Sequence, residues 1–375
     1  MVLTHASYYA GASHLTSGKP VQDRAAALDI VYGEDAKATV LLLSDGHGSE
    51  QHFRSDIGAA FAIEAAAEAL PYILEVLPGR MGEVPVSRGP AESSCMTEAD
   101  RTAPDPSCES AMRMFFTRIN ILWARKVLDH WKQCPPPEGS STLAGAARAY
   151  GCTLVGAVRT EDFWMAFQLG DGACVALRDD CTEDDPIPGD SRCRMSRTTS
   201  MCIHEARDFR YSYGRDIPPV LMLCSDGLAD CYENHNELAR RFLAQIAIDY
   251  ASEGLKYVED EIAEVLPEMS ETITGDDMSL AFWIDTEAVA AMAGRLKELN
   301  ETLQQQELAQ AYVQLESYDK SIAEIEGRIT SLSTSQPEEQ EEMQRKLSVL
   351  STLKRRQSEL LEQIDSIKLN LCNRS

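Results

Sequence analysis

The stretch Leu41–Glu50, LLLSDGHGSE, is an apolar run that ends abruptly in Ser-Asp-Gly, followed by His-Gly. A closely similar phrase without the histidine, LMLCSDGLAD, occurs far downstream at Leu221–Asp230. Such an apolar run predicts a buried strand, and the glycine after the aspartate permits a sharp turn or the close approach of a carbonyl or ligand. Each phrase is therefore expected to present one aspartate, Asp45 or Asp226, at a fixed strand end.

Three further aspartates occupy comparable places. Asp23 precedes a strand-like segment, Asp171 lies in QLGDGA, and Asp276 opens DDMSLAFW. Any one of them alone is ordinary turn chemistry. Several that converge at one edge of a β-framework would form an all-oxygen cage, the donor set that Mg²⁺ and Mn²⁺ prefer. The acids are spread over about 250 residues, which excludes the compact loop of an EF-hand calcium site.

The rest of the first 285 residues predicts a mixture of helices and strands. Residues 78–108 are rich in Pro, Gly, Ser and charge without sustained periodicity, so we expect a mobile surface insertion there. A second polar stretch, 179–200, is expected to be an irregular connection. Strands are expected at 25–32, 39–43, 151–160, 163–179, 218–227 and 276–285. Those at 151–160 and 163–179 are expected to pair as a hairpin. Helices are expected at 54–77, 109–132 and, with a break near Gly254, 236–266.

From Thr286 onward the composition shifts to Glu, Gln, Leu, Lys and Ser. Apolar residues recur at heptad spacing on both sides of a short break, the first set at Leu308, Leu315, Ile322 and Ile329. After the break, Ser335 can serve as an N-cap and Pro337 stands near the first turn of a new helix. We therefore expect a domain at 1–285 and an antiparallel helical hairpin or coiled coil at 286–375.

The chain has 375 residues, 44% of them apolar, and a net charge of −25. Its last 90 residues carry 11 basic and 15 acidic side chains, so −21 of this charge lies in residues 1–285. That charge repels phosphate backbones and argues against a nucleic-acid partner. No window approaches the roughly 18 unbroken apolar residues that span a bilayer, and no basic leader is present. The eleven cysteines show neither a CxxC pair nor zinc-site spacing. These features predict a soluble, reduced, cytoplasmic protein without a membrane segment.

Five motifs together suggest a family. DGHG after an apolar strand, GCT followed by LGDGAC, SDGLAD and DDMSLAFW occur in this order, and GASHLTSGKPVQD precedes them. The ordered set resembles the signatures of the type 2C metal-dependent Ser/Thr protein phosphatases, and its first motif resembles that of a bacterial subgroup. The resemblance covers about residues 5–285. It implies an α+β fold in which a central β-sandwich is flanked by helix pairs on both sides.

The resemblance also implies a site for two Mg²⁺ or Mn²⁺ ions and a weaker third position. Asp45 would bridge the two ions and Asp23 would act mostly through bound water, while Asp171 with Asp226 would match the third position. His47 corresponds to the histidine proposed as general acid. The metal ligands so implied are Asp23, Asp45, the Gly46 carbonyl, Asp171, Asp226 and Asp276.

The implied reaction is hydrolysis of phosphoserine or phosphothreonine in proteins. Two ions about 3.5–4 Å apart can activate a bridging water and clamp the phosphate oxygens during in-line attack. The leaving alkoxide is strongly basic, and a histidine such as His47 is suited to protonate it. The alternative role for His47 is that of a loop histidine bonded to a neighbouring carbonyl.

The first motif departs from the family pattern. The family has an arginine that binds phosphate and then Glu-Asp, whereas this chain has Gln22-Asp23 without a preceding arginine. Lys19 or His14 could replace that arginine as the phosphate-binding cation, although the simpler explanation of each is an ordinary surface residue. Loss of the glutamate removes one water-mediated metal contact.

Two other functional hypotheses stay open at this point. The first is a weak or inactive pseudophosphatase that acts as a scaffold, although such domains usually lose the metal-binding acids that this chain keeps. The second gives the hairpin at 286–375 the main role, through a protein partner or self-association, because an exposed heptad seam must be buried somewhere. Packing of the hairpin on itself or on its own domain is the simpler explanation of the same pattern.

Overall fold

The computed structural model describes residues 1–83, 86–89, 105–136, 143–187, 198–231, 237–332 and 337–373. The chain divides into two compact units, Met1–Ala293 and Gly294–Ser375. Most of the expected insertion at 78–108 lies outside the described residues. Inside that range the structure has a short strand, β4 (Val86–Gly89), and the beginning of a helix at Pro106.

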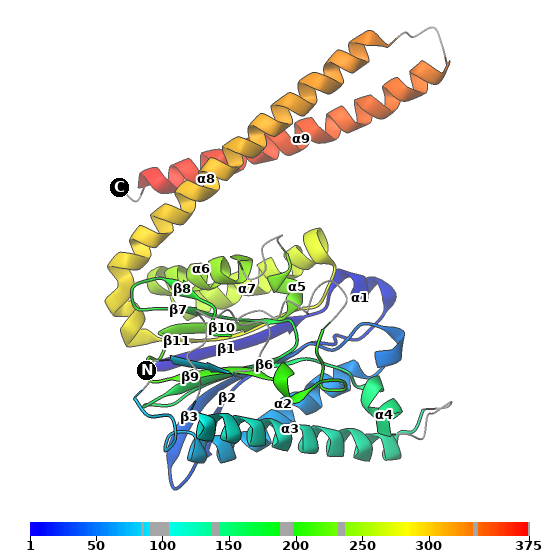
Figure 1. The fold of residues 1–375 in the computed structure, drawn as a ribbon. Coiled ribbons are helices and arrows are strands. Elements are labelled where there is room, and N and C mark those ends of the chain that lie inside the picture. Colours follow the sequence, from blue (N-terminus) through cyan, green and yellow to red (C-terminus); the bar gives the residue numbers. More distant parts are fainter. Residues whose placement is uncertain are drawn as a thin grey trace. The chain divides into compact units, whose positions relative to one another are not determined.

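The first unit contains two antiparallel sheets with helices on their outer faces (Figure 1). This is the α+β sandwich implied by the resemblance, and the prediction of fold class is confirmed. The five-stranded sheet has the order β1 (Val2–Tyr9), β11 (Met278–Asp285), β10 (Val220–Cys224), β7 (Ala173–Leu177) and β8 (Glu183–Asp184). The six-stranded sheet has the order β2 (Arg24–Tyr32), β3 (Ala36–Ser44), β5 (Leu154–Arg159), β6 (Trp164–Leu169), β9 (Arg210–Gly214) and β4.

The unbroken apolar run of β3 follows from burial on both faces of its sheet. Leu41 and Leu43 point into the layer between the two sheets, where they share a core with Trp283 of β11. Val40 and Leu42 point the other way, into the core under the helices. A strand buried on both faces reads as a continuous apolar run rather than an alternating one.

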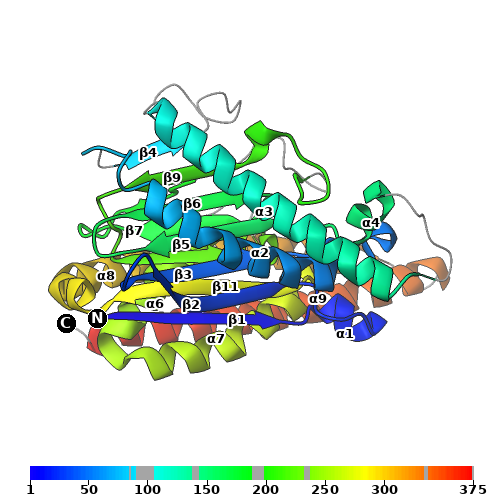
Figure 2. The ribbon, with the colours of Figure 1, turned by 90° about the horizontal axis from the view of Figure 1, so that it is seen from below.

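Two long helices, α2 (Ser55–Val76) and α3 (Pro106–Gln133), cover the six-stranded sheet (Figure 2). On the other side, α6 (Glu237–Glu253) and α7 (Leu255–Met269) cover the five-stranded sheet (Figure 1). The break between them falls at Gly254, as expected, and this glycine has a positive φ of 88°. Within the described part of the chain, α2 alone is long and apolar enough to cross a membrane by length and composition, and it contributes a row of alanines to the core.

The expected hairpin of 151–160 with 163–179 is only half correct. β5 and β6 do pair antiparallel, from Leu154 opposite Leu169 onward. The second segment, however, contains two strands that belong to different sheets, because the chain crosses from β6 to β7 at Gly170-Asp171-Gly172. Gly170 has a φ of 117°, which glycine adopts without strain. Asp171 therefore lies at a crossover between the sheets and not inside a hairpin.

The second unit is the helical hairpin expected from the heptads. Its helices belong to α8 (Thr286–Ser331), which begins in the first unit, and α9 (Pro337–Asn373). The helices run antiparallel, since Lys354 pairs with Glu326 and Gln363 with Glu307. Ser335, the expected N-cap, lies outside the described residues. The apolar seam is buried between the two helices and consists of Leu308, Ala311, Leu315, Tyr318, Leu360 and Ile364.

Candidate metal centre

Three of the expected aspartates come together where strands of both sheets end. Asp45 directly follows β3, Asp171 lies at the crossover from β6 to β7, and Asp226 begins the short helix α5 (Asp226–Ala229) after β10. Carboxylate oxygens of the three lie within 4.8 Å of one another. Residues far apart in the sequence thus form one group of acidic oxygens, at a spacing suited to a hard divalent cation.

The electrostatics of this group favour a bound cation. Burial raises the pKa of Asp45 well above its usual range, and the charges of Asp226, Asp23 and Asp171 raise it further. The pKa of Asp226 is raised in the same way, first by burial and then by Asp171 and Asp276. Several ionised carboxylates cannot share a buried site without compensation. The donor set therefore fits Mg²⁺ or Mn²⁺, whose charge would let all of them ionise.

Asp23 and Asp276 flank the group at different depths. Asp23 is only 1% exposed, and its Oδ2 accepts a hydrogen bond of 2.6 Å from the Ser279 hydroxyl. Burial raises its pKa from 3.8 to about 7 even though that hydrogen bond acts in the opposite direction. Asp276, just before β11, is exposed at the surface of the same site.

A cavity of about 640 Å³ opens beside these acids. It is large enough for a phosphorylated side chain, and Asp45, Asp171 and Asp226 are among its lining residues. Its walls come from the DGHG loop, the segment after Thr198 and the strand-end acids. The lining residues are Gln22, Asp45, Gly46, His47, Gly48, Ser49, His52, Asp171, Thr198, Ser200, Cys202, Ile203, Asp226, Asp276 and Asp277.

Both Ser-Asp-Gly glycines are required by close packing rather than by a special backbone turn. Neither Gly46 nor Gly227 has a positive φ. A Cβ on Gly46 would lie 2.8 Å from the Gln22 carbonyl oxygen, and one on Gly227 would lie 2.1 Å from that of Asp277. Real Cβ atoms do not approach so closely. Of the two roles expected for these glycines, the structure shows the close approach of a carbonyl.

Residues 10–267 match the family model described as Protein phosphatase 2C. The chain belongs to the protein phosphatase 2C family. Members of this family are metal-dependent enzymes, and the chain is a protein serine/threonine phosphatase. No curated protein matches it in sequence.

Among solved structures, the phosphatase is similar to three bacterial enzymes. A bacterial serine phosphatase is 14% identical, with 76% of this chain and 97% of that chain covered and a TM-score of 0.45. The serine/threonine phosphatase Stp1 from Staphylococcus aureus is 14% identical, with coverages of 76% and 95% and a TM-score of 0.44. The serine/threonine phosphatase of S. agalactiae is 11% identical, with coverages of 76% and 99% and a TM-score of 0.46.

His47 of the phosphatase lies in the cavity wall and is paired with a second histidine. Its ring meets that of His52 edge to face, with 4.8 Å between the ring centroids. Burial, and then the neighbouring His52, lower the pKa of His47 to about 4. The ring is therefore neutral at pH 7 in the metal-free protein.

Sequence reasoning missed His52. It lies in a single helical turn seven residues after Asp45, and no motif singles it out. Its Nδ1 is 2.9 Å from the Ser49 hydroxyl. Both histidines also pack against Gly151, where a Cβ would lie 2.7 Å from the ring of His52 and 2.9 Å from that of His47. A histidine close behind DGHG is the signal that could have identified it.

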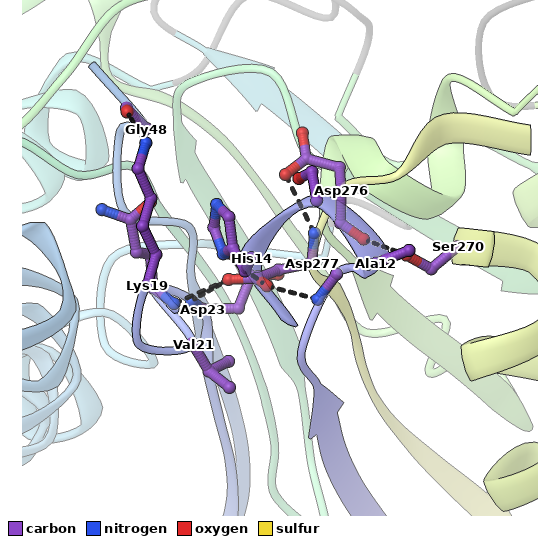
Figure 3. A network of polar contacts seen from close by, with 12 residues as sticks. Ala12, His14, Lys19, Val21, Asp23, Gly48, Ser270, Asp276 and Asp277 are labelled. Atoms are coloured by element: carbon purple, nitrogen blue, oxygen red, sulfur yellow. Dashed lines mark hydrogen bonds and ion pairs between the residues drawn. The ribbon is translucent and has the colours of Figure 1, made fainter. Parts of the chain in front are cut away.

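The two candidate phosphate-binding cations lie at different depths (Figure 3). Lys19 is exposed, and its Nζ donates to the Gly48 carbonyl at 3.0 Å, beside the DGHG loop. His14 is 7% exposed, and its Nδ1 lies 2.8 Å from Asp277 Oδ1. Lys19 is thus at the rim of the site, whereas the imidazole of His14 faces a buried carboxylate.

Proposed function

We propose that this phosphatase hydrolyses phosphoserine and phosphothreonine in proteins at a centre of two Mg²⁺ or Mn²⁺ ions. The observation that carries the proposal is the convergence of Asp45, Asp171 and Asp226 within 4.8 Å. Asp276, Asp23 and the carbonyl of the residue after Asp45 would complete the set of ligands. When bound, the ions would neutralise these carboxylates, activate water as the nucleophile and hold the phosphate oxygens.

The protein's own groups would do the remaining chemistry. His47, which lines the cavity, would donate a proton to the departing serine or threonine oxygen. The dianionic phosphate of the substrate would raise the pKa of His47 from its low value in the empty cavity and so prepare it for this role. Lys19, which lies beside Gly48, would attract the phosphate as a point charge rather than as a bidentate clamp.

A cytoplasmic location and a protein-binding role for the hairpin are further proposals. The eight cysteines whose side chains the structure describes are all free thiols, in keeping with a reducing compartment. The main apolar seam of the hairpin is already buried within it, so a partner or a second copy would bind its outer faces. We do not propose the inactive scaffold, because the metal-binding acids are retained.

The proposal is tested with a phosphoserine peptide and the full-length protein. We expect phosphate release with Mn²⁺ or Mg²⁺, and a loss of at least about a hundredfold in EDTA, since metal stabilisation of the transition state is worth several kcal/mol. The substitution Asp226→Asn should abolish turnover and leave the circular dichroism spectrum unchanged. Undiminished activity in EDTA, or no activity of the folded protein with any divalent metal, would overturn the proposal.

A further inference from the structure

We propose that Asp277 is a positioning residue of the metal centre. With His14 and Gln22 it forms a buried polar clasp, which holds the segment 11–23 against the beginning of β11 and thereby sets the place of Asp23. The inference rests on the proposed metal-dependent function. It gives Asp277, which follows the proposed ligand Asp276, a role in orienting metal ligands rather than in binding the metal.

Asp277 uses both carboxylate oxygens to bind main-chain N–H groups from the two ends of that segment (Figure 3). Its Oδ1 accepts from Gly11 at 2.7 Å and its Oδ2 accepts from Gln22 at 2.6 Å. The N–H of Asp23 lies 3.4 Å from the same Oδ2. The side chain is only 3% exposed, so these bonds replace water as partners of the carboxylate. An amide could not do the same, because it has only one acceptor atom.

The imidazole of His14 lies directly against this buried carboxylate. It comes from the single-turn helix α1 (Ala12–Ser17), and its Nδ1 lies 2.8 Å from Asp277 Oδ1. The two side chains are 9% and 3% exposed. A buried carboxylate is tolerated when hydrogen-bond donors surround it, and the backbone N–H groups of Gly11, Gln22 and Asp23 approach Asp277 here.

A second set of contacts fixes the same segment to the residues before β11. The Ser270 hydroxyl accepts from the N–H of Ala12 at 3.0 Å and donates to the Asp276 carbonyl at 2.7 Å. Gly11 packs so closely here that a Cβ would lie 2.4 Å from the carbonyl carbon of Asp276. The backbone of Asp276, a proposed metal ligand, is therefore held directly against the segment 11–23.

Gln22 carries the connection on to the DGHG loop. While its N–H is bound to Asp277, its side-chain Nε2 donates to the His47 carbonyl at 3.3 Å and to the Ser55 hydroxyl at 2.5 Å. The glutamate of the family motif has no N–H to donate at that point. The clasp thus links the beginning of β11 in one sheet to the loop after β3 in the other, the two places from which Asp276 and Asp45 emerge.

The test measures metal binding directly, without turnover. Full-length protein is freed of metal and titrated with Mn²⁺ in a calorimeter, well below its unfolding temperature. We expect Asp277→Ala to weaken Mn²⁺ binding by about tenfold, the usual effect of losing a group that orients metal ligands. Ile119→Ala, in the core under α3 and fully buried, is the matched control. It should lower stability and leave Mn²⁺ affinity at the wild-type value.

Variants at His14 and Gln22 separate the positioning of metal ligands from general destabilisation of the fold. At His14, Asn places an amide nitrogen close to the position of Nδ1 and should keep most of the affinity, whereas Leu should lose it. At Gln22, Met lacks the Nε2 donor to the His47 carbonyl and should weaken Mn²⁺ binding. If Asp277→Ala fails to fold, Asp277→Asn, which keeps one acceptor, should show a smaller loss of affinity in the same direction.

Hydrogen exchange on the metal-free protein distinguishes failure of the positioning role from failure of the proposed function. Amide protons of segment 11–23 should exchange faster in Asp277→Ala than in the wild type, even though no metal is bound to either protein. Faster exchange together with unchanged Mn²⁺ affinity in that variant would overturn the positioning role alone. A wild-type protein that binds no Mn²⁺ would overturn the proposed function, and the inference with it.

Discussion

Asp23 lies almost entirely out of water among other carboxylates, and this makes the metal-free protein sensitive to pH. Its pKa in the folded state is about 7, above the ordinary value of 3.8. The folded state therefore holds this proton more tightly, and the stabilisation that it gives is complete below about pH 4 and is lost as the pH rises through 7. The slope for one proton is about 1.4 kcal/mol per pH unit.

We expect the free energy of unfolding in EDTA to fall between pH 4 and 7, and Asp23→Asn to remove that part of the slope. Urea unfolding at half-unit pH intervals measures it. Saturating Mn²⁺ should counteract the trend, because metal competes with protons for the same oxygens. The interpretation fails if the wild type and Asp23→Asn have the same pH dependence in EDTA.

His47 gives a second prediction at the scale of one residue. Replacement by Ala should reduce the rate on a phosphoserine peptide by about 10²–10⁴-fold, the usual contribution of general acid catalysis. On nitrophenyl phosphate the loss should be much smaller, because nitrophenolate leaves without protonation. Steady-state rates on both substrates provide the comparison. Equal losses on both would assign His47 to positioning instead.

The sequence pattern predicted the five aspartates as candidate ligands, but it did not predict the residues that contact them. Asp45, Asp171 and Asp226 were predictable because each stands beside a glycine at the end of an apolar run, a local signal. The contacts of Asp277 were not, because its partners Gly11, His14 and Gln22 lie far away in the sequence. The sequence also could not tell that His14 faces a carboxylate, whereas Lys19 remains at the rim.

At the scale of the element, prediction succeeded where burial left a local pattern. β3, β10 and β11 are continuous apolar runs because both faces of each are covered. β1 was missed because it is an edge strand of mixed, half-buried residues and has no such run. The assignment of β6 and β7 to different sheets is decided by packing around Gly170 and Gly172, which neighbouring residues do not encode.

The ion pair between Arg159 and Asp285, which joins the two sheets, offers a test at this scale. Arg159 at the end of β5 bonds Asp285 at the end of β11. The other oxygen of Asp285 accepts from the N–H groups of Glu287 and Ala288 at the beginning of α8. Asp285→Ala removes a cap and leaves the guanidinium without its partner, so we expect a loss of about 1–3 kcal/mol.

Chemical denaturation followed by tryptophan fluorescence measures this loss. Glu161→Ala, which changes an exposed acid two residues after Arg159, is the control and should change stability by less than about 0.5 kcal/mol. If Asp285→Ala were as stable as this control, the pair would have no structural role.

At the scale of the whole molecule, the chain is a phosphatase unit followed by a helical hairpin. Ile364 is 1% exposed in the seam of the hairpin. Ile364→Ala should destabilise the hairpin by about 2–5 kcal/mol and leave turnover of nitrophenyl phosphate unchanged. Val313→Ala, at a position that is 71% exposed, is the control. Circular dichroism during heating measures the stability of the variants, and activity assays measure their turnover. A loss of turnover in the Ile364 variant would contradict the division into a phosphatase unit and a separate hairpin.

The proposed function requires that strand ends from the two sheets meet to bind metal. Crystals grown with Mn²⁺ and measured near the manganese absorption edge test it directly. We expect anomalous peaks within about 2.5 Å of carboxylate oxygens of Asp45 and Asp226, with Asp45 shared between two ions. A map with no peak at these residues, or with manganese bound only elsewhere, would contradict the account.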